Sequence, residues 1–148
     1  VRAALEAAGL TIEIRETENA RTAVDAATAV GCEVDQIAKS IIFWGESSDA
    51  PILFLTAGGN RVDDDCAAAL AGEPLRRAEA DRVRAATGFA IGGVAPVGHL
   101  SPVRAFFDPR LAEFDMVWAA AGTPQHVFSI APQDLITLAD AKLGDFTE

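Results

Sequence analysis

The chain has 148 residues, 50% of them hydrophobic, and a net charge of −10 from twelve basic and twenty-two acidic side chains. A chain of this length buries roughly 70% of its unfolded surface, so we expect one folded domain over residues 1–148 and exclude a disordered chain. The acidic balance excludes broad adhesion to nucleic acid, because such binding depends on neutralised phosphates, but it is compatible with a local basic pocket.

The N-terminal segment, residues 1–9, is rich in alanine and ends in a glycine, which predicts a helix. Glu6 interrupts it, so it lacks the apolar core of a signal peptide. No apolar run in the sequence approaches the roughly 20 residues of a membrane span. We therefore expect a cytoplasmic protein with no membrane partner.

The next segments predict a strand followed by two helices. Apolar residues alternate over residues 11–16, as in a half-buried strand. Thr22 is suited to the N-cap and Gly31 to the end of a helix between them. Residues 33–38 predict a short third helix.

Two β-rich runs, residues 39–45 and 51–59, flank the sequence ESSDA and predict a hairpin. Residues 62–72 place three carboxylates at a helix start, where the helix dipole favours negative charge. A calcium loop needs acidic residues spaced further apart, so we interpret these carboxylates as capping groups. Residues 79–88 predict another helix that ends in a glycine.

The last third of the chain predicts three more strands and a closing helix. The strands are expected over residues 103–109, 115–122 and 126–132, and the helix over 132–140 with its proline in the first turn. The whole pattern predicts an α+β protein with five to seven strands in a mixed sheet and helices packed against it.

Cys32 and Cys66 are the only cysteines, 34 residues apart in the sequence. We expect two buried free thiols, because neither belongs to a paired motif. With His99 and His126 the chain has four soft ligands, but none of the spacings that bind zinc. We therefore predict neither a metal site nor a cofactor.

Residues 87–100, TGFAIGGVAPVGHL, combine glycines with a proline between two apolar segments. Gly92, Gly93 and Gly98 let backbone N–H groups approach a ligand, while Pro96 stiffens the loop. Such amides can hold an oxyanion or a carbonyl oxygen. The spacing matches neither a dinucleotide fingerprint nor a P-loop. A tight turn or bulge without function is the alternative interpretation.

Lys39 begins the strand KSIIFWG, where it would share one face with Ile41 and Phe43. Ser40 would lie on the opposite face. A lysine at a strand edge often only extends its ammonium to water. The functional interpretation places this ammonium at the mouth of a pocket, facing a phosphate or a carbonyl oxygen.

Residues 119–130, AAAGTPQHVFSI, make a turn at Gly122, after which His126 would share a face with apolar strand residues. His126 is either structural or a hydrogen-bond partner of a substrate or water. Asn60 and Arg61 follow a second glycine pair in a turn before a helix. Arg61 is one of few basic residues near such a loop and is suited to a phosphate.

Taken in chain order, these segments resemble the YbaK/ProX family of aminoacyl-tRNA deacylases, which includes the editing domain inserted in bacterial prolyl-tRNA synthetases. The resemblance covers about residues 2–140. Its most specific parts are KSIIF, which begins at Lys39, and the loop GFAIGGVAPVGH.

The resemblance implies a mixed, barrel-like sheet flanked by helices, with a pocket over it. It implies hydrolysis of the ester that joins a wrong amino acid to tRNA, without a metal, by positioned water, backbone amides and a lysine. Lys39 would orient the ester, and the amides at Gly92 and Gly93 would hold its carbonyl or the water. The expected substrate-binding residues are Thr22, Ser40, Asn60, Arg61, Pro96, Gly98, His99, Gly122 and His126.

The chain departs from the family pattern in two places. It has no tyrosine, which places a cysteine-removing specificity in doubt. His126 lies close to the place of a histidine in alanine-removing relatives, but its register against Gln125 is open.

The expected partner is the acceptor end of an aminoacyl-tRNA, bound weakly through Lys39, Arg61 and Arg104 and aided by a synthetase. The leading hypothesis is a trans-editing enzyme acting on mischarged tRNA for proline. The alternatives are a non-catalytic module that binds an amino acid, nucleotide or tRNA end, and a hydrolase of another small acyl ester. The amino acid removed and the oligomeric state stay open.

Overall fold

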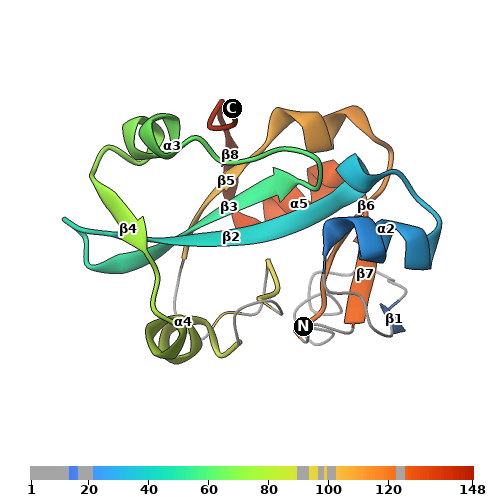
Figure 1. Cartoon of the computed structure of the whole chain (residues 1–148), viewed down its shortest axis with the longest axis horizontal. Coiled ribbons are helices and arrows are strands. Elements are labelled where there is room, and N and C mark those ends of the chain that lie inside the picture. Colours follow the sequence, from blue (N-terminus) through green and yellow to red (C-terminus); the bar gives the residue numbers. More distant parts are fainter. Residues whose placement is uncertain (1–13, 17–21, 90–93, 97–98, 100–102, 123–125) are drawn as a thin grey trace.

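The computed structural model describes residues 14–16, 22–89, 94–96, 99, 103–122 and 126–148. Within these residues a mixed eight-stranded sheet carries four α-helices (Figure 1). The predicted α+β class, a mixed sheet flanked by helices, is confirmed. The helix expected over residues 1–9 lies outside the described residues, as do Gly92, Gly93 and Gly98.

The strands are β1 (Ile14–Glu16), β2 (Ile37–Gly45), β3 (Ala50–Ala57), β4 (Leu75–Arg77), β5 (Arg104–Phe107), β6 (Val117–Ala120), β7 (His126–Ile130) and β8 (Ala141–Leu143). The helices are α2 (Ala23–Val30), α3 (Asp64–Ala71), α4 (Ala80–Thr87) and α5 (Pro132–Ala139). Two 3-10 helices, η1 (Val34–Gln36) and η2 (Pro109–Glu113), lie before β2 and after β5.

The sheet is built around the hairpin of β2 and β3, whose prediction is confirmed. Its strand order is β1-β7-β6-β2-β3-β5-β8, and β4 also pairs with β2. The pairs β2–β6, β3–β5 and β5–β8 are parallel, and the other pairs are antiparallel. In Figure 1 the hairpin runs across the view while β7 runs steeply to it, so the sheet curves between the two.

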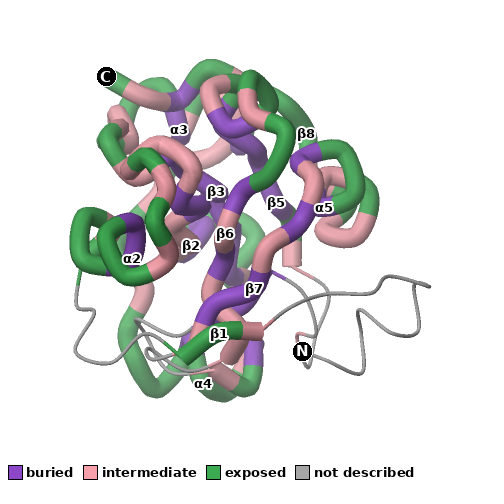
Figure 2. The backbone as a smooth tube through the Cα atoms, turned by 90° about the vertical axis from the view of Figure 1, so that its right-hand side faces the viewer, coloured by how far each residue is buried: buried purple, intermediate pink, exposed green. Residues whose placement is uncertain are grey.

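Helices cover both faces of the sheet. On one face α5 and η2 pack over a core that includes Phe107 and Phe128, both fully buried. On the other face α3 covers Phe54, whose ring stacks on that of Phe106 with centroids 5.3 Å apart. Helix α2 packs on Ile37, the first residue of β2. Figure 2 shows α2 and α5 on opposite sides of β6 and β7.

Capping residues set the helix ends as predicted. Thr22 Oγ1 accepts a hydrogen bond from Asp25 N at 3.1 Å at the start of α2, and Gly31 ends that helix with φ 75°. Asp63 caps α3 by accepting from the amides of Asp65 and Cys66. Local sequence therefore determines where these helices begin and end.

Two predictions about the elements were wrong. The helix expected over residues 33–38 is only the 3-10 helix η1, because Ile37 and Ala38 already pair with β6. The sheet has eight described strands rather than five to seven, because β4 and β8 were not predicted. Each has three residues, so neither carries a recognisable alternation; neighbouring strands define them.

Candidate active site

A cavity of about 580 Å³ lies between α2, β2 and the strands β6 and β7. A volume of this size is typical of a small-molecule site. The described residues that line it are Thr22, Ala23, Val24, Ala26, Ile37, Ala38, Lys39, Ser40, Ile41, Gly58, Val94, Trp118, Ala119, Ala120, His126 and Val127.

The cavity lies beside an incompletely paired stretch of β2. Along one edge, β2 pairs with β6 only at Ile37 and Ala38, and with β4 only from Phe43 to Gly45. Among the described residues, 39–42 therefore have a strand partner on one side only, which is β3. Lys39 and Ser40 come directly after the last residue paired with β6, and both line the cavity.

The Lys39 side chain is partly buried and lines this cavity. Its Nζ donates a hydrogen bond to the Asn60 carbonyl oxygen at 2.8 Å. Burial lowers the pKa of Lys39 below its ordinary value, and the nearby Arg61 charge lowers it further, while Asp108 and Asp35 act in the opposite direction. The ammonium is thus held at a defined position between charges of both signs.

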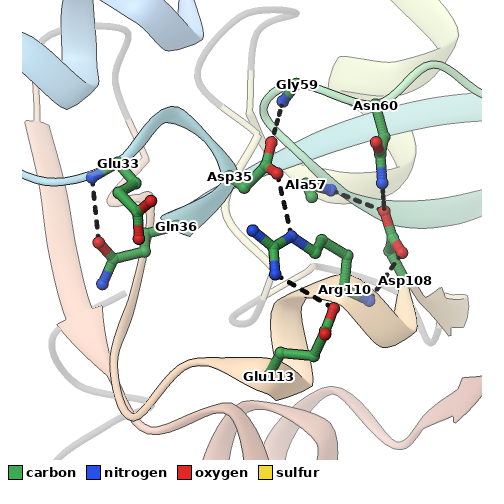
Figure 3. A network of polar contacts seen from close by, with 9 residues as sticks. All are labelled: Glu33, Asp35, Gln36, Ala57, Gly59, Asn60, Asp108, Arg110 and Glu113. Atoms are coloured by element: carbon green, nitrogen blue, oxygen red, sulfur yellow. Dashed lines mark hydrogen bonds and ion pairs between the residues drawn. The ribbon is translucent and has the colours of Figure 1, made fainter.

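A polar network fixes the turn that receives this ammonium (Figure 3). Asp108 Oδ2 accepts from Ala57 N at 3.1 Å and from Asn60 Nδ2 at 2.9 Å. On the other side, Asp35 Oδ1 accepts from Gly59 N at 2.9 Å. The Nε of Arg110 lies 3.0 Å from Asp35 Oδ2, so η1 and η2 are joined across the turn. Two carboxylates from distant segments therefore hold residues 57–60.

Ser40 is a second polar residue that lines the cavity. Its Oγ is buried and has no hydrogen-bond partner among the described residues. A buried hydroxyl without a partner is unfavourable in the free protein. This hydroxyl therefore has unused hydrogen-bonding capacity in a residue that lines the cavity.

The remaining walls are mainly apolar, with one histidine. Trp118 lines the cavity, and the Arg15 guanidinium carbon lies 5.2 Å from the centroid of its ring. His126 is the first residue of β7 and lies opposite Glu16 of β1. Val24, on the first turn of α2, is 62% exposed although it lines the cavity. The site thus combines an apolar wall with three polar side chains from β2 and β7.

Gly58 and Val94 also line the cavity. Val94, which directly follows the glycine pair 92–93 in the chain, is buried and lines it. Gly58 lines it as well, and a Cβ there would overlap the Val34 carbonyl oxygen. The turn after β3 can therefore approach η1 only because this position carries no side chain.

The structure brings together four of the residues expected to form the site: Thr22, Lys39, Ser40 and His126 all line the cavity. Asn60 contacts Lys39 through its backbone carbonyl, and Arg61 is close enough to affect its pKa. The predicted roles of Gly92, Gly93 and Gly98 fall outside the described residues.

Four other residues expected to contact the substrate or its phosphates do not line the cavity: Pro96, His99, Gly122 and Arg104. His99 Nε2 lies 2.6 Å from the Ala95 carbonyl oxygen, and burial lowers the pKa of this histidine. Arg104 pairs with Glu73 at 3.1 Å. In the sheet Arg104 lies level with Phe43, about 13 Å along β2 from Lys39.

Sequence reasoning missed Asp108, Gly58 and Trp118. The sequence analysis placed Asp108 inside the strand expected over residues 103–109 and gave it no other role. Its hydrogen bonds to residues 57 and 60 span about fifty positions of sequence, which no local pattern reports. The glycine pair Gly58-Gly59 was recognised as a turn, and that turn was the only available indication.

Both cysteines are free, as predicted, but the expectation that they are buried was wrong. Cys32 is partly buried and Cys66 is exposed. Cys66 lies on the solvent side of α3, next to Ala67, the residue that enters the core. No cluster of three or more metal-ligating side chains occurs in the described part of the chain. None of the described helices is long and apolar enough to cross a membrane.

Comparisons with known proteins identify the class of domain to which this fold belongs. The profile of the aminoacyl-tRNA editing domain matches residues 17–138. The chain belongs to this family of aminoacyl-tRNA editing domains.

Two similar proteins and one solved structure give a more detailed comparison. It is 30% identical to the uncharacterized protein YwhH of Bacillus subtilis (strain 168), covering 88% of this chain and 83% of YwhH. It is also 30% identical to a proline–tRNA ligase of Shouchella clausii (strain KSM-K16), covering 86% of this chain but 22% of the ligase. A crystal structure of a proposed trans-editing enzyme for prolyl tRNA synthetase has a TM-score of 0.93 and 46% identity, covering 99% of this chain and 94% of that one.

Proposed function

We propose that this domain hydrolyses the ester of mischarged aminoacyl-tRNA, and that Lys39 at the cavity carries the reaction. One observation is the main support for this proposal. Lys39 lines the cavity of a chain that belongs to the aminoacyl-tRNA editing domains, and its ammonium is held by a hydrogen bond of 2.8 Å to the Asn60 carbonyl oxygen. The tRNA for proline is the proposed substrate because two relatives are named for prolyl-tRNA synthesis or its editing. Action in trans is supported by the relative that this chain covers almost completely.

The proposed reaction needs no nucleophilic side chain. A water attacks the aminoacyl carbonyl, the tetrahedral intermediate carries an oxyanion, and the acyl C–O bond breaks. The ribose oxygen leaves and takes up a proton, which a neighbouring ribose hydroxyl can relay. An ester is already reactive, so holding the water and stabilising the oxyanion supply most of the catalysis.

Each group has a proposed role in this scheme. Lys39 orients the ester and stabilises its negative charge. The amides of Gly92 and Gly93 hold the carbonyl or the attacking water, a role supported by the position of Val94 on the cavity wall. Ser40 and His126 bind polar groups of the aminoacyl-adenosine.

A small amino acid is the proposed cargo. Five alanines and a glycine are among the residues that line the cavity, at positions 23, 26, 38, 58, 119 and 120. The same 580 Å³ must also admit part of the terminal adenosine. Selection among small side chains is therefore modest, since one methylene is worth only about 1–3 kcal/mol.

The test is deacylation of a panel of mischarged tRNAs by the wild type, Lys39→Ala and Lys142→Ala. The chain has only two lysines, and Lys142 is exposed on β8, so its variant is a matched control. We expect Lys39→Ala to lose on the order of 100-fold or more in kcat/KM and Lys142→Ala to keep wild-type activity. A wild type that binds acceptor ends but deacylates no member of the panel is a binding module instead.

Salt dependence tests the proposed weak contact with tRNA. Only a few cations are available near the cavity, so few phosphates are neutralised. We expect log Kobs to fall with log salt with a slope no steeper than about −3, which corresponds to roughly three or four contacts. A much steeper slope contradicts recognition limited to the acceptor end.

A further inference from the structure

Asp108 is a buried carboxylate whose bonding exceeds what a helix cap requires. It is 2% exposed and follows β5 directly, where its Oδ1 accepts from Arg110 N at 3.0 Å and so caps η2. An asparagine caps a helix about as well as an aspartate and carries no charge. Burying a charge is unfavourable unless hydrogen bonds compensate for it. The second oxygen of this carboxylate therefore points to a further role.

That second oxygen holds the turn after β3. Oδ2 of Asp108 accepts from the backbone N of Ala57 and from Nδ2 of Asn60. The backbone N of Asn60 also donates to the Ala57 carbonyl oxygen at 2.9 Å, and this bond closes the turn. Asn60 is thus tied by its side chain to Asp108 and by its backbone to the end of β3.

The same turn receives the Lys39 ammonium. The Asn60 carbonyl accepts from Lys39 Nζ at 2.8 Å. A shift of Asn60 therefore moves the acceptor that fixes the ammonium at the cavity. Three charged groups act on this ammonium among the described elements packed around it: Arg61 after the turn, Asp108 before η2 and Asp35 of η1.

We propose that Asp108 is a positioning residue, which sets the place of the Lys39 ammonium through Asn60 and balances the charge of Arg61. This inference rests on the proposed role of Lys39 in deacylation. Asp108 itself does not line the cavity. It acts through the turn that it holds and through its charge.

Asp108→Asn perturbs both actions with little change of volume. Its amide oxygen keeps the hydrogen bond from Arg110 N, so η2 stays capped. Its NH₂ group then faces two donors, the Ala57 amide and Asn60 Nδ2, which disrupts the turn. Losing the negative charge also lowers the pKa of Lys39 further, because Asp108 raises it in the wild type.

The matched control is Asp63→Asn, the same change at the cap of α3. There a single oxygen, Oδ1, accepts from both Asp65 N and Cys66 N, so an asparagine keeps both bonds. Asp63 is not among the charges that act on Lys39. A second variant, Asn60→Ala, removes the bond to Asp108 but keeps its charge.

The chain has two lysines, which makes the ammonium directly observable. Protein labelled with 13C-lysine gives two side-chain signals, and Lys142→Arg assigns them. We expect the Lys39 titration to move to lower pH in Asp108→Asn and to stay in place in Asp63→Asn. In deacylation, Asp108→Asn and Asn60→Ala lose on the order of 10- to 100-fold in kcat with a smaller change in KM, while Asp63→Asn keeps the wild-type values.

Circular dichroism and thermal unfolding establish that each variant is folded. A folded Asp108→Asn with the wild-type Lys39 titration and kcat overturns the proposal. If Asp108→Asn does not fold, Asn60→Ala decides, and wild-type kcat in that variant overturns it. A wild type without deacylase activity refutes the proposed function alone, because the Lys39 titration still measures the action of Asp108.

Discussion

Replacing Ser40 by alanine should stabilise the ligand-free protein. The Ser40 hydroxyl is buried and unpaired among the described residues. An unsatisfied buried polar group costs about 1–3 kcal/mol, and an apolar replacement removes that cost. For a domain of this size 1 kcal/mol corresponds to about 2–4 °C in Tm. We therefore expect Ser40→Ala to raise Tm by about 2–12 °C.

The same substitution should weaken the substrate complex. In the proposed complex the hydroxyl bonds a polar group of the substrate, and the substitution leaves that group without a partner. We expect kcat/KM for aminoacyl-tRNA to fall by about 5- to 10-fold, which corresponds to the ~1 kcal/mol of one ordinary hydrogen bond. Stability and activity thus change in opposite directions, as at sites that hold polar groups ready for a ligand.

Differential scanning calorimetry without ligand, followed by deacylation kinetics, measures both effects. Thr87→Val is the control, because the Thr87 hydroxyl is also buried but is bonded: it donates to Val83 O at 2.7 Å and accepts from Phe89 N at 3.1 Å. That variant should lower Tm and leave kcat/KM unchanged, since α4 does not line the cavity. A lower Tm for Ser40→Ala would refute the reasoning, because it would mean that the hydroxyl is bonded in the free protein.

Two further predictions concern the glycine turn and a buried histidine. Gly58→Ala should lower Tm by about 2–12 °C and reduce deacylation, because its Cβ would overlap Val34 O and lie 3.0 Å from Ala23 Cβ; unchanged Tm and activity would contradict that close approach. Burial lowers the pKa of His99 from 6.5, so the stability it contributes is fully present above pH 6.5 and is lost as the pH falls through the folded-state pKa. His99→Gln can still donate to Ala95 O, so its Tm should fall less than that of the wild type between pH 7 and 5, and equal falls would show that His99 does not cause the loss.

Local signals were sufficient for the four described α-helices and the hairpin. Thr22, Asp63 and three glycines with positive φ end or begin helices where capping chemistry predicts. The strands β2 and β3 carry long β-rich runs and pair along their whole length. Each of these features depends on residues that lie close together in the sequence. It can therefore be predicted from one amino-acid sequence.

The site depended on contacts that the sequence does not display. Lys39 was singled out for its place at a strand start, but its acceptor, Asn60, follows 21 residues later. Among the described strands, the edge of β2 at residues 39–42 is unpaired because β6 ends and β4 begins where they do. Asp108 joins this region from 48 residues beyond Asn60. These contacts between distant residues form only when the strands have assembled into the sheet, so local sequence does not reveal them.

The charge distribution explains how an acidic protein can act on tRNA. Several arginines are already paired with carboxylates: Arg82 with Asp49, Arg104 with Glu73 and Arg110 with Asp35. None of the hydrogen bonds or ion pairs of the described residues engages the Arg61 guanidinium, which lies beside Lys39. Lys39 and Arg61 therefore supply positive charge beside the cavity, while the net charge of −10 repels the rest of the nucleic acid. Under the proposed function we therefore expect contact with the acceptor end rather than with the whole tRNA, which the salt dependence of binding tests.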